Sequence, residues 1–260
     1  MQAALPMYFP PREALQAFWA ALADLLRADA ACAGLDIPQT LSWPLDVHAQ
    51  WQASDLLLSQ ACGFPLMTLL AGKVQLVGTL AYQAPGVKGI DCRSQLVCRA
   101  GDARQEVTQF AGSTLAFNDR ISQSGYNALR ALLAGTTTQR PFFAQELDTG
   151  AHYRSIEAVR TGQADMAAID PVSYVHWQRS HPDLRAQLRV FGQTEAYPGL
   201  PLITSLQTPA AVLGALRRAL HTLAHDARNL DVRTPLLITG FESTRITDYQ
   251  VCLDMQALAA

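Results

Sequence analysis

Three junctions in the middle of this chain, each between a strand-like run and a helical pattern, carry side chains that could bind an anion. The residues at these junctions are Ser122 and Ser124, then His152, and then Asp170. Hydroxyl and imidazole groups donate hydrogen bonds, and a carboxylate accepts one from a protonated oxygen or an amine. Ligands of open α/β sheets lie beyond the carboxyl ends of the strands, so these residues predict a polar ligand site.

Each of these residues also has an ordinary structural interpretation. Ser122 or Ser124 could cap the helix that follows, and Gly125 could let a bound group approach the backbone closely. Asp170 precedes a proline, as helix caps often do, and His152 could be a capping or surface histidine. The sequence leaves both interpretations open. Because a helix start also attracts anions, the coincidence of three such junctions favours a ligand site.

Serine, histidine and a carboxylate are also the residue types of a hydrolytic triad, which would use Ser124, His152 and Asp170. The local motif argues against this alternative, because "S-Q-S-G" is not the G-x-S-x-G nucleophile elbow. A serine at a helix start would also have its hydroxyl engaged in capping. We therefore expect no catalytic residues and do not expect an enzyme.

The elements that would position these side chains follow from the spacing of apolar residues. Short apolar runs alternate with longer amphipathic patterns, which indicates an α/β fold with mainly parallel sheets flanked by helices. The predicted strands are 54–60, 73–82, 94–100, 113–118, 164–170, 188–194 and 200–205, and the predicted helices are 10–29, 123–134, 152–162, 171–180 and 208–226.

The length of 260 residues favours two lobes, because single cores stop growing near this size. Segments 83–92 and 194–201 are rich in glycine or proline and are the best candidates for crossings between lobes. The sequence therefore predicts one lobe from residues 1–91 and 195–260 and a second lobe from residues 92–194. A two-strand hinge would join the lobes, and the ligand would bind in the cleft between them.

Composition excludes several classes of partner. The formal charge of −2 and the absence of any run of like charges argue against nucleic acid and against a polybasic membrane anchor. The five cysteines are odd in number and lack C-x-x-C spacing, so neither a full disulfide framework nor a zinc site is indicated, and we expect mostly buried or idle thiols. No metal and no cofactor are expected. A secretory signal peptide begins with a basic segment followed by an apolar one, and the first residues of this chain lack that pattern.

Several stretches together resemble the periplasmic substrate-binding proteins of phosphate, phosphonate and phosphite ABC importers, which have the type II periplasmic-binding-protein fold. These stretches are "DLLLSQACGFPL", "CRSQLVCR", "FNDRISQSGYNALR", "TGAHYRSIEAVRTGQADMAAID" and "YPGLPLIT", in the same order along the chain as in that family. The resemblance spans about residues 5 to 225. It implies a two-lobed protein that captures a small phosphorus oxyanion in an interlobe cleft and delivers it to an ABC transporter permease.

By the same resemblance, Ser122, Ser124 and the backbone amides of the "SQSGY" turn hold the oxyanion group. His152 would donate to it, and Asp170 would accept from a protonated ligand oxygen or an amine. These roles make Gly125 part of the ligand-binding turn. Phosphate, phosphite and phosphonates would all use such donors, so the identity of the ligand stays open.

Further positions bear on the ligand by resemblance. Gln60 and Cys62 would face it from the other lobe. The chain has Tyr126 where many phosphonate binders have a small hydroxyl residue, and Cys92 where an aromatic residue often stands, so the pocket could be reshaped. Arg93 could supply a cation or lie on the solvated surface, and a disulfide between Cys62 and Cys92 is left open.

The resemblance implies a periplasmic, monomeric protein without a cofactor. The missing signal pattern keeps an alternative open, in which the chain is a cytosolic ligand sensor or a biosynthetic enzyme built on the same fold.

Overall fold

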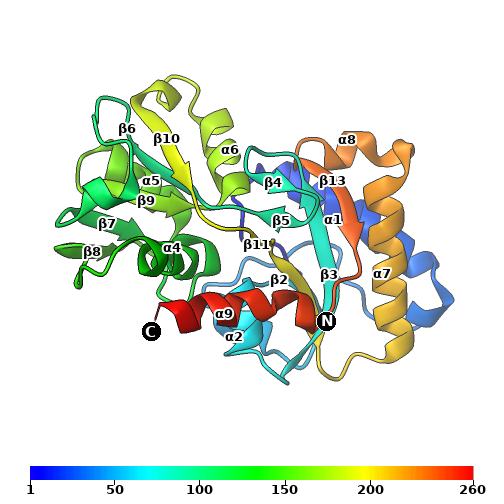
Figure 1. Ribbon diagram of the computed structural model, residues 1–260. Helices are drawn as coiled ribbons and strands as arrows, with labels where there is room; N and C mark the ends of the chain where they lie inside the picture. Colours follow the sequence, from blue (N-terminus) through cyan, green and yellow to red (C-terminus); the bar gives the residue numbers. More distant parts are fainter. Residues whose placement is uncertain (260) are drawn as a thin grey trace. The chain divides into compact units, whose positions relative to one another are not determined.

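The computed structural model describes residues 1–259 and divides the chain into two compact units. The first unit contains Met1–Gln83, Lys88–Ile90 and Pro198–Asp248, and the second contains Ala84–Val87, Asp91–Tyr197 and the chain from Tyr249 onward. Figure 1 shows the path of the chain by colour. Three strands of two residues each lie where the chain passes from one unit to the other: β4 (Val87–Lys88), β5 (Asp91–Cys92) and β11 (Tyr197–Pro198).

The first unit is built on a five-stranded sheet in the order β1-β2-β12-β3-β13. Helices α1 and α7 contact each other, and α7 packs against β3 and β13. Apolar side chains at helical spacing, such as Leu15, Phe18 and Leu22, explain why α1 forms and which face it buries. The bounds are β1 (Gln2–Ala4), β2 (Leu56–Gln60), β3 (Val74–Tyr82), β12 (Pro201–Ser205), β13 (Ile238–Glu242), α1 (Arg12–Ala28), α2 (Val47–Trp51), α3 (Gly63–Met67), α7 (Ala210–His225) and α8 (Leu230–Arg233).

The second unit has its own five-stranded sheet, in the order β10-β6-β9-β7-β8. Helix α5 contacts β6, β7 and β9, and α4 contacts α9. The bounds are β6 (Gln95–Arg99), β7 (Thr114–Phe117), β8 (Gln145–Asp148), β9 (Met166–Ile169), β10 (Leu188–Gln193), α4 (Ala128–Thr136), α5 (His152–Arg160), α6 (Pro171–Ser180) and α9 (Gln250–Leu258).

Both sheets are mixed in direction, which corrects the expectation of mainly parallel sheets. In the first unit β1 and β2 are parallel, while β12 is antiparallel to β2 and β3. In the second, β7 is parallel to β8 and β9, while β6 is antiparallel to β9 and β10. A continuous apolar sequence indicates that both faces of a strand are buried, whether the strand is parallel or antiparallel to its neighbours. Direction depends on the connections, and β12 follows a passage through the second unit instead of a simple strand-helix-strand crossover.

The C-terminal helix α9 belongs to the second unit, although the sequence predicts residues 195–260 within the first lobe. Cys252 and Met255 are its buried side chains, and Met255 packs in a cluster with Ala128 of α4. In Figure 1 α9, in red, lies beside α4, in green.

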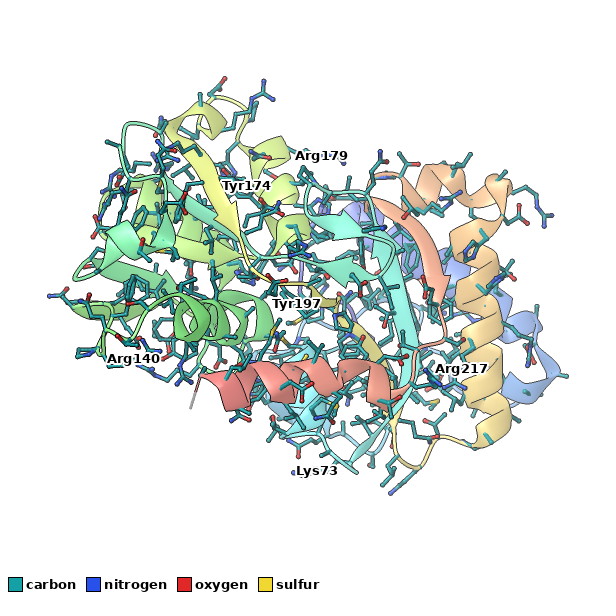
Figure 2. All side chains as sticks on the ribbon, in the orientation of Figure 1. Lys73, Arg140, Tyr174, Arg179, Tyr197 and Arg217 are labelled. Atoms are coloured by element: carbon teal, nitrogen blue, oxygen red, sulfur yellow. The ribbon has the colours of Figure 1, made fainter. Side chains whose placement is uncertain are left out.

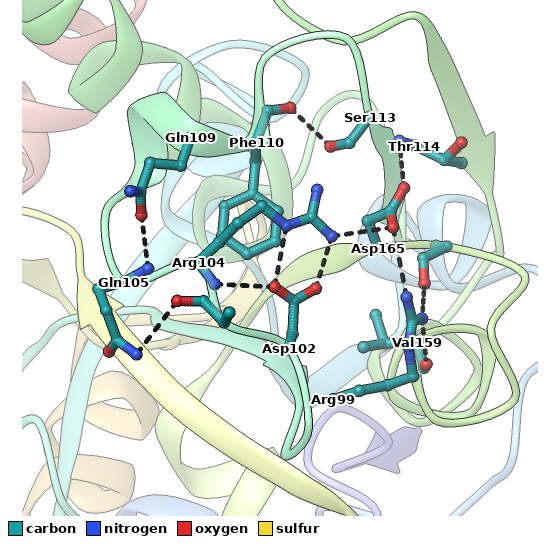
Figure 3. A network of polar contacts seen from close by, with 12 residues as sticks. Arg99, Asp102, Arg104, Gln105, Gln109, Phe110, Ser113, Thr114, Val159 and Asp165 are labelled. Carbon is teal, nitrogen blue, oxygen red and sulfur yellow. Dashed lines mark hydrogen bonds and ion pairs between the residues drawn. The ribbon is translucent and has the colours of Figure 1, made fainter.

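A polar network holds the amino ends of β7 and β9 (Figure 3). Asp165, just before β9, accepts hydrogen bonds from the backbone N–H of Thr114 at 2.9 Å and from Arg104 at 3.0 Å. Arg104 also donates to Asp102 at 2.9 Å, and Arg99 donates to Asp165 at 3.3 Å. The opposite, carboxyl ends of the same two strands lead to Asn118 and Asp170, so this network fixes the strands that carry the candidate site.

Within the described residues, no helix is long and apolar enough to cross a membrane. The same residues contain no cluster of three or more side chains suited to hold a metal ion. All five cysteines are buried, and none of them forms a disulfide in the part of the chain that the structure describes.

Candidate functional site

A single π-helical turn, Gln123–Asn127, follows β7 and leads into α4. Ser122 caps it, because its hydroxyl oxygen accepts the N–H of Gly125 at 3.0 Å. The N–H of Asn127 donates to the carbonyl of Ser122 at 2.9 Å, which is the i to i+5 bond of a π-helix. The capping interpretation of Ser122 is therefore confirmed. Single π-helical turns occur frequently at functional sites.

Gly125 packs closely against two side chains of the same unit. A Cβ placed on it would lie 1.8 Å from Oδ1 of Asn118 and 3.1 Å from Cε1 of His152. The first distance is far inside van der Waals contact, so a larger residue would displace the Asn118 side chain or the turn. The sequence suggested that Gly125 lets a ligand approach, and the structure shows that it lets Asn118 and His152 approach.

His152 begins α5 and forms a hydrogen bond with Ser124. The hydroxyl oxygen of Ser124 lies 2.8 Å from Nε2 of His152. Both side chains are buried. Burial lowers the pKa of His152 to about 4, so the ring is neutral at pH 7 and carries one N–H.

A neutral His152 and the hydroxyl of Ser124 hold two polar hydrogens between them, and their mutual bond uses one. In one tautomer Ser124 donates to Nε2 and the N–H is on Nδ1; in the other, Nε2 donates and the hydroxyl hydrogen of Ser124 remains. Either way one donor is left over. Nδ1 of His152 and Oδ1 of Asn118 are both buried and have no hydrogen-bond partner among residues 1–259. Unsatisfied buried atoms of this kind are few in native proteins and call for an explanation such as a ligand.

Asp170 caps α6. Its Oδ1 accepts the N–H groups of Val172 at 2.8 Å and Ser173 at 3.0 Å, with Pro171 at the first helical position. The capping interpretation of Asp170 is confirmed as well. Burial raises the pKa of Asp170 to about 6, against the opposing effect of these hydrogen bonds. A buried carboxyl with this pKa changes its protonation state close to neutral pH.

The three residues of the hydrolytic alternative do not form a catalytic triad. Ser124 and His152 are bonded, but a triad requires a carboxylate on the other ring nitrogen. Nδ1 of His152 has no partner within the described chain, and Oδ1 of Asp170 accepts two backbone N–H groups instead. A ring with a pKa of about 4 is also a weak base at neutral pH.

Two further candidates of the second unit are engaged elsewhere. Tyr126 lies in the core against Phe117, and its hydroxyl accepts from Arg120 at 2.7 Å and donates to Glu146 at 3.2 Å. Arg93 donates to the carbonyl of Thr194 at 3.0 Å and is partly exposed, which agrees with its surface interpretation. The structure does not join either side chain to the Ser124–His152 pair by a hydrogen bond.

Gln60 and Cys62 belong to the first unit. Nε2 of Gln60 donates to the hydroxyl of Tyr82 at 3.1 Å, and both side chains are buried. Cys62 is buried at the start of α3.

Ser94 is a residue of this site that the sequence did not point to. Its hydroxyl donates to the carbonyl of Ser124 at 2.7 Å and lies 2.6 Å from the hydroxyl of Tyr197. Because the one hydrogen of Ser94 is used on Ser124, Tyr197 is the donor to Ser94. Figure 2 labels Tyr197, the last residue of the second unit before the chain passes to the first. "CRSQ" contains Ser94, but only the fold shows that it meets the π-helical turn.

Several solved structures share the fold of this chain. A binding protein component of an ABC phosphonate transporter from Pseudomonas aeruginosa has a TM-score of 0.77 at 16% identity, covering 99% of this chain and 86% of its own. PhnD1 from Prochlorococcus marinus, solved with methylphosphonate, has a TM-score of 0.74 at 12% identity, with coverages of 98% and 97%. A Xanthomonas citri protein solved with ATP has a TM-score of 0.68 at 17% identity, with coverages of 99% and 96%.

These identities are low, and they establish the two-lobed type II periplasmic-binding-protein fold alone. No curated protein matches the chain. A family model described as "ABC transporter, phosphonate, periplasmic substrate-binding protein" matches residues 50–249, which includes the π-helical turn, His152 and Asp170. With most of its length matched, the chain belongs to the family of periplasmic substrate-binding proteins of phosphonate ABC transporters.

Proposed function

We propose that this protein binds a small phosphorus oxyanion, a phosphonate, phosphite or phosphate, at the π-helical turn and passes it to an ABC importer in the periplasm. The observation that carries the proposal is the pair of buried polar atoms without partners beside Gly125, Nδ1 of His152 and Oδ1 of Asn118. Leaving such atoms unpaired destabilises a protein, and a ligand that pairs them recovers that energy.

The side chains of the site differ in what they offer to a ligand. Ser124 and His152 have one hydrogen left to donate, which suits an oxyanion. Asn118 offers an amide oxygen, and Asp170 offers a carboxyl group with a pKa of about 6. An acceptor needs a hydrogen on the ligand. A site with both a donor and acceptors should therefore bind a protonated monoanion, or a phosphonate that also carries an ammonium group.

The rest of the proposal concerns the lobes. The lobes would correspond to the two compact units, which differ from the predicted bounds at α9 and at a few residues of the crossings, such as Ala84–Val87. Gln60 and Cys62 would face the ligand from the first. Gly86 and Gly89 have φ angles of +87° and +61°, a backbone conformation that glycine adopts without strain. Such positions suit a hinge segment.

The methylphosphonate bound to PhnD1 and the transporter role of the Pseudomonas aeruginosa protein agree with this proposal. Both share the fold with this chain at low identity, and their ligand and role are extended to this chain only as part of the proposal. The family membership supports the periplasm and the ABC permease as the setting.

A thermal-unfolding panel tests the proposal directly. The ligands are methylphosphonate, 2-aminoethylphosphonate, phosphite and phosphate, with sulfate, chloride and ATP as comparisons. A ligand present at about one hundred times its Kd adds about 2.7 kcal/mol of stability. We expect at least one phosphorus oxyanion to raise Tm in this way. If none does at millimolar concentration, the protein does not bind this class of solute.

A further inference from the structure

The C-terminal helix α9 holds the π-helical turn through side-chain hydrogen bonds. Nδ2 of Asn127 donates to the carbonyl of Cys252 at 2.9 Å, and Nε2 of Gln123 donates to Sδ of Met255 at 3.1 Å. Asn127 and Gln123 are the last and first residues of the turn, so α9 contacts it at both ends.

The two amides also bond to each other, which makes one connected chain of donors and acceptors. Nδ2 of Asn127 donates to Oε1 of Gln123 at 2.8 Å, so the two hydrogens of that nitrogen serve Gln123 and Cys252. The amide of Gln123 accepts through oxygen and donates through nitrogen to Met255. All four side chains are buried. Loss of any one of these hydrogen bonds therefore leaves a buried polar atom unpaired. Because the bonds are connected, the loss of one weakens the others.

Met255 also links α9 to the segments at which the chain enters and leaves the second unit. It packs in an apolar cluster with Cys92, Tyr197 and Ala128. Tyr197 in turn donates to Ser94, whose hydroxyl binds the carbonyl of Ser124. The turn is thus held by α9 on its amide side chains and by Ser94 on its backbone.

A π-helical turn needs support of this kind, because π-helices are rare and occur mostly as single turns held within α-helices. The family model ends at residue 249, immediately before α9. The segment that supports the turn therefore lies outside the part of the chain that defines the family match.

We propose that α9 is a positioning element of the binding site. It sets the π-helical turn, and through it Ser124, Gly125 and the ring of His152, so that residues 250–258 determine ligand affinity without touching the ligand. The effect on affinity rests on the proposed function, whereas the effect on the turn does not.

Two substitutions test this. Met255→Leu nearly conserves volume and removes the sulfur that accepts from Gln123. Asn127→Leu removes both amide donors in a side chain of similar size. Met67→Leu, the same chemical change in the first unit, and Gln256→Ala, on the exposed face of α9, are the controls.

The first measurement is the ¹H–¹⁵N spectrum of the ligand-free protein, with the signals of the Gly125 amide and the His152 ring assigned. Met255→Leu and Asn127→Leu should shift both signals, and neither control should. The second is calorimetric titration with methylphosphonate and phosphite. A displaced hydrogen bond to a charged ligand lowers affinity by about tenfold or more, and we expect this loss in both test variants.

The outcomes separate the two proposals. If the wild type binds no anion of the panel, the proposed function fails, and the spectra of the ligand-free variants still decide the role of α9. If Met255→Leu and Asn127→Leu lower the free energy of unfolding but leave the Gly125 and His152 signals and the affinity at wild-type values, then α9 only stabilises the fold and the inference is overturned.

Discussion

The hydroxyl oxygen of Ser124 lies 2.8 Å from Nε2 of His152, and the other ring nitrogen has no partner in the described part of the chain. In a hydrolase that nitrogen would donate to a carboxylate, which would hold the tautomer and stabilise the charged ring. Here the ring is buried and neutral, with a pKa of about 4. The pair is therefore suited to donate one hydrogen bond to a ligand, and poorly suited to remove a proton.

Two neighbouring serines should separate binding from stability. Ser124→Ala should lower affinity for the bound oxyanion by about tenfold or more, because a hydrogen bond to a charged group contributes about 1.5–3 kcal/mol. Ser122→Ala should instead lower the free energy of unfolding by about 1 kcal/mol, because it removes the cap of Gly125. Calorimetry and denaturant unfolding of both variants measure the two effects. A loss of stability with unchanged affinity for Ser124→Ala would assign that residue a purely structural role.

Glycine-to-alanine substitutions at two nearby positions should have opposite signs. Gly125→Ala places a Cβ 1.8 Å from Oδ1 of Asn118, so either the Asn118 side chain or the turn must shift, and we expect a loss of about 1–3 kcal/mol together with weaker binding. Gly135→Ala in α4 meets no atom within 4 Å and should raise stability by about 0.5–1 kcal/mol. Urea unfolding of both variants checks the contrast. Equal effects would mean that Gly125 is not closely packed.

The buried groups of Asp170 and His152 should make opposite contributions to the pH dependence of stability. The pKa of Asp170 is raised from 3.8 to about 6, so its contribution falls as pH rises from about 4 to 6. The pKa of His152 is lowered from 6.5 to about 4, so its contribution falls as pH drops through the same window. A pKa change of this size corresponds to about 3 kcal/mol for each group, and in the wild type the two slopes largely cancel.

Removing one of the two titrating groups should reveal the pH dependence of stability that the other group causes. Asp170→Asn keeps a capping oxygen and should lose stability more steeply than the wild type as pH falls from about 6.5 to 4.5. His152→Gln should become relatively more stable over the same fall in pH. Denaturant midpoints of the three proteins at several pH values test this. Parallel curves for all three would show that neither group has a shifted pKa.

Binding should weaken as the ligand loses its second proton. That ionisation lies near pH 6 to 7 for phosphate-like groups, and a charged Asp170 repels the dianion. His152 is neutral across this range, so it adds no charge of its own to the trend. Asp170→Asn should flatten the dependence for phosphite or methylphosphonate and weaken 2-aminoethylphosphonate sharply. Titrations from about pH 5.5 to 8.5 decide it, and identical profiles for both proteins would mean that Asp170 acts only as the cap of α6.

A ligand-induced closure of the proposed lobes should be visible by X-ray scattering. Hinge rotation would use φ/ψ changes near residues 86–89 and 197–199. The radius of gyration should fall when the binding anion is added at saturation. An unchanged radius would contradict a ligand-driven hinge motion.

Much of the fold could be predicted from apolar spacing. All seven predicted strands and all five predicted helices coincide with elements of the structure within a few residues. The predictions miss β1, β8, β13 and the two-residue strands β4, β5 and β11, and also the short helices α2, α3 and α8. Strand β8, "QELD", is an edge strand with mostly exposed side chains, so no apolar alternation marks it. Helix α9 was also missed, because only Cys252 and Met255 are buried on it and they give little periodicity.

The candidate site could be predicted only as a set of residue types. Strand ends and helix starts predict Ser122, Ser124, His152 and Asp170 as one site, and all four belong to the second unit. Of these side chains, the structure joins only Ser124 and His152 by a hydrogen bond. The π-helical hydrogen bond and the contact of Gly125 with Asn118 depend on side chains whose positions only the folded chain defines. The setting of Tyr126 also depends on such contacts, because Arg120 and Glu146 bind its hydroxyl.

All five cysteines are buried, so the native chain should react little with thiol-directed fluorescent dyes. A thiol reacts as its thiolate, and burial raises the pKa of Cys32, Cys92 and Cys98, which slows that reaction. Cysteines introduced at exposed positions, such as Gln207 of the first unit and Thr138 of the second, should therefore take up a dye pair without removal of native thiols. Energy transfer between the dyes would then follow ligand uptake one molecule at a time.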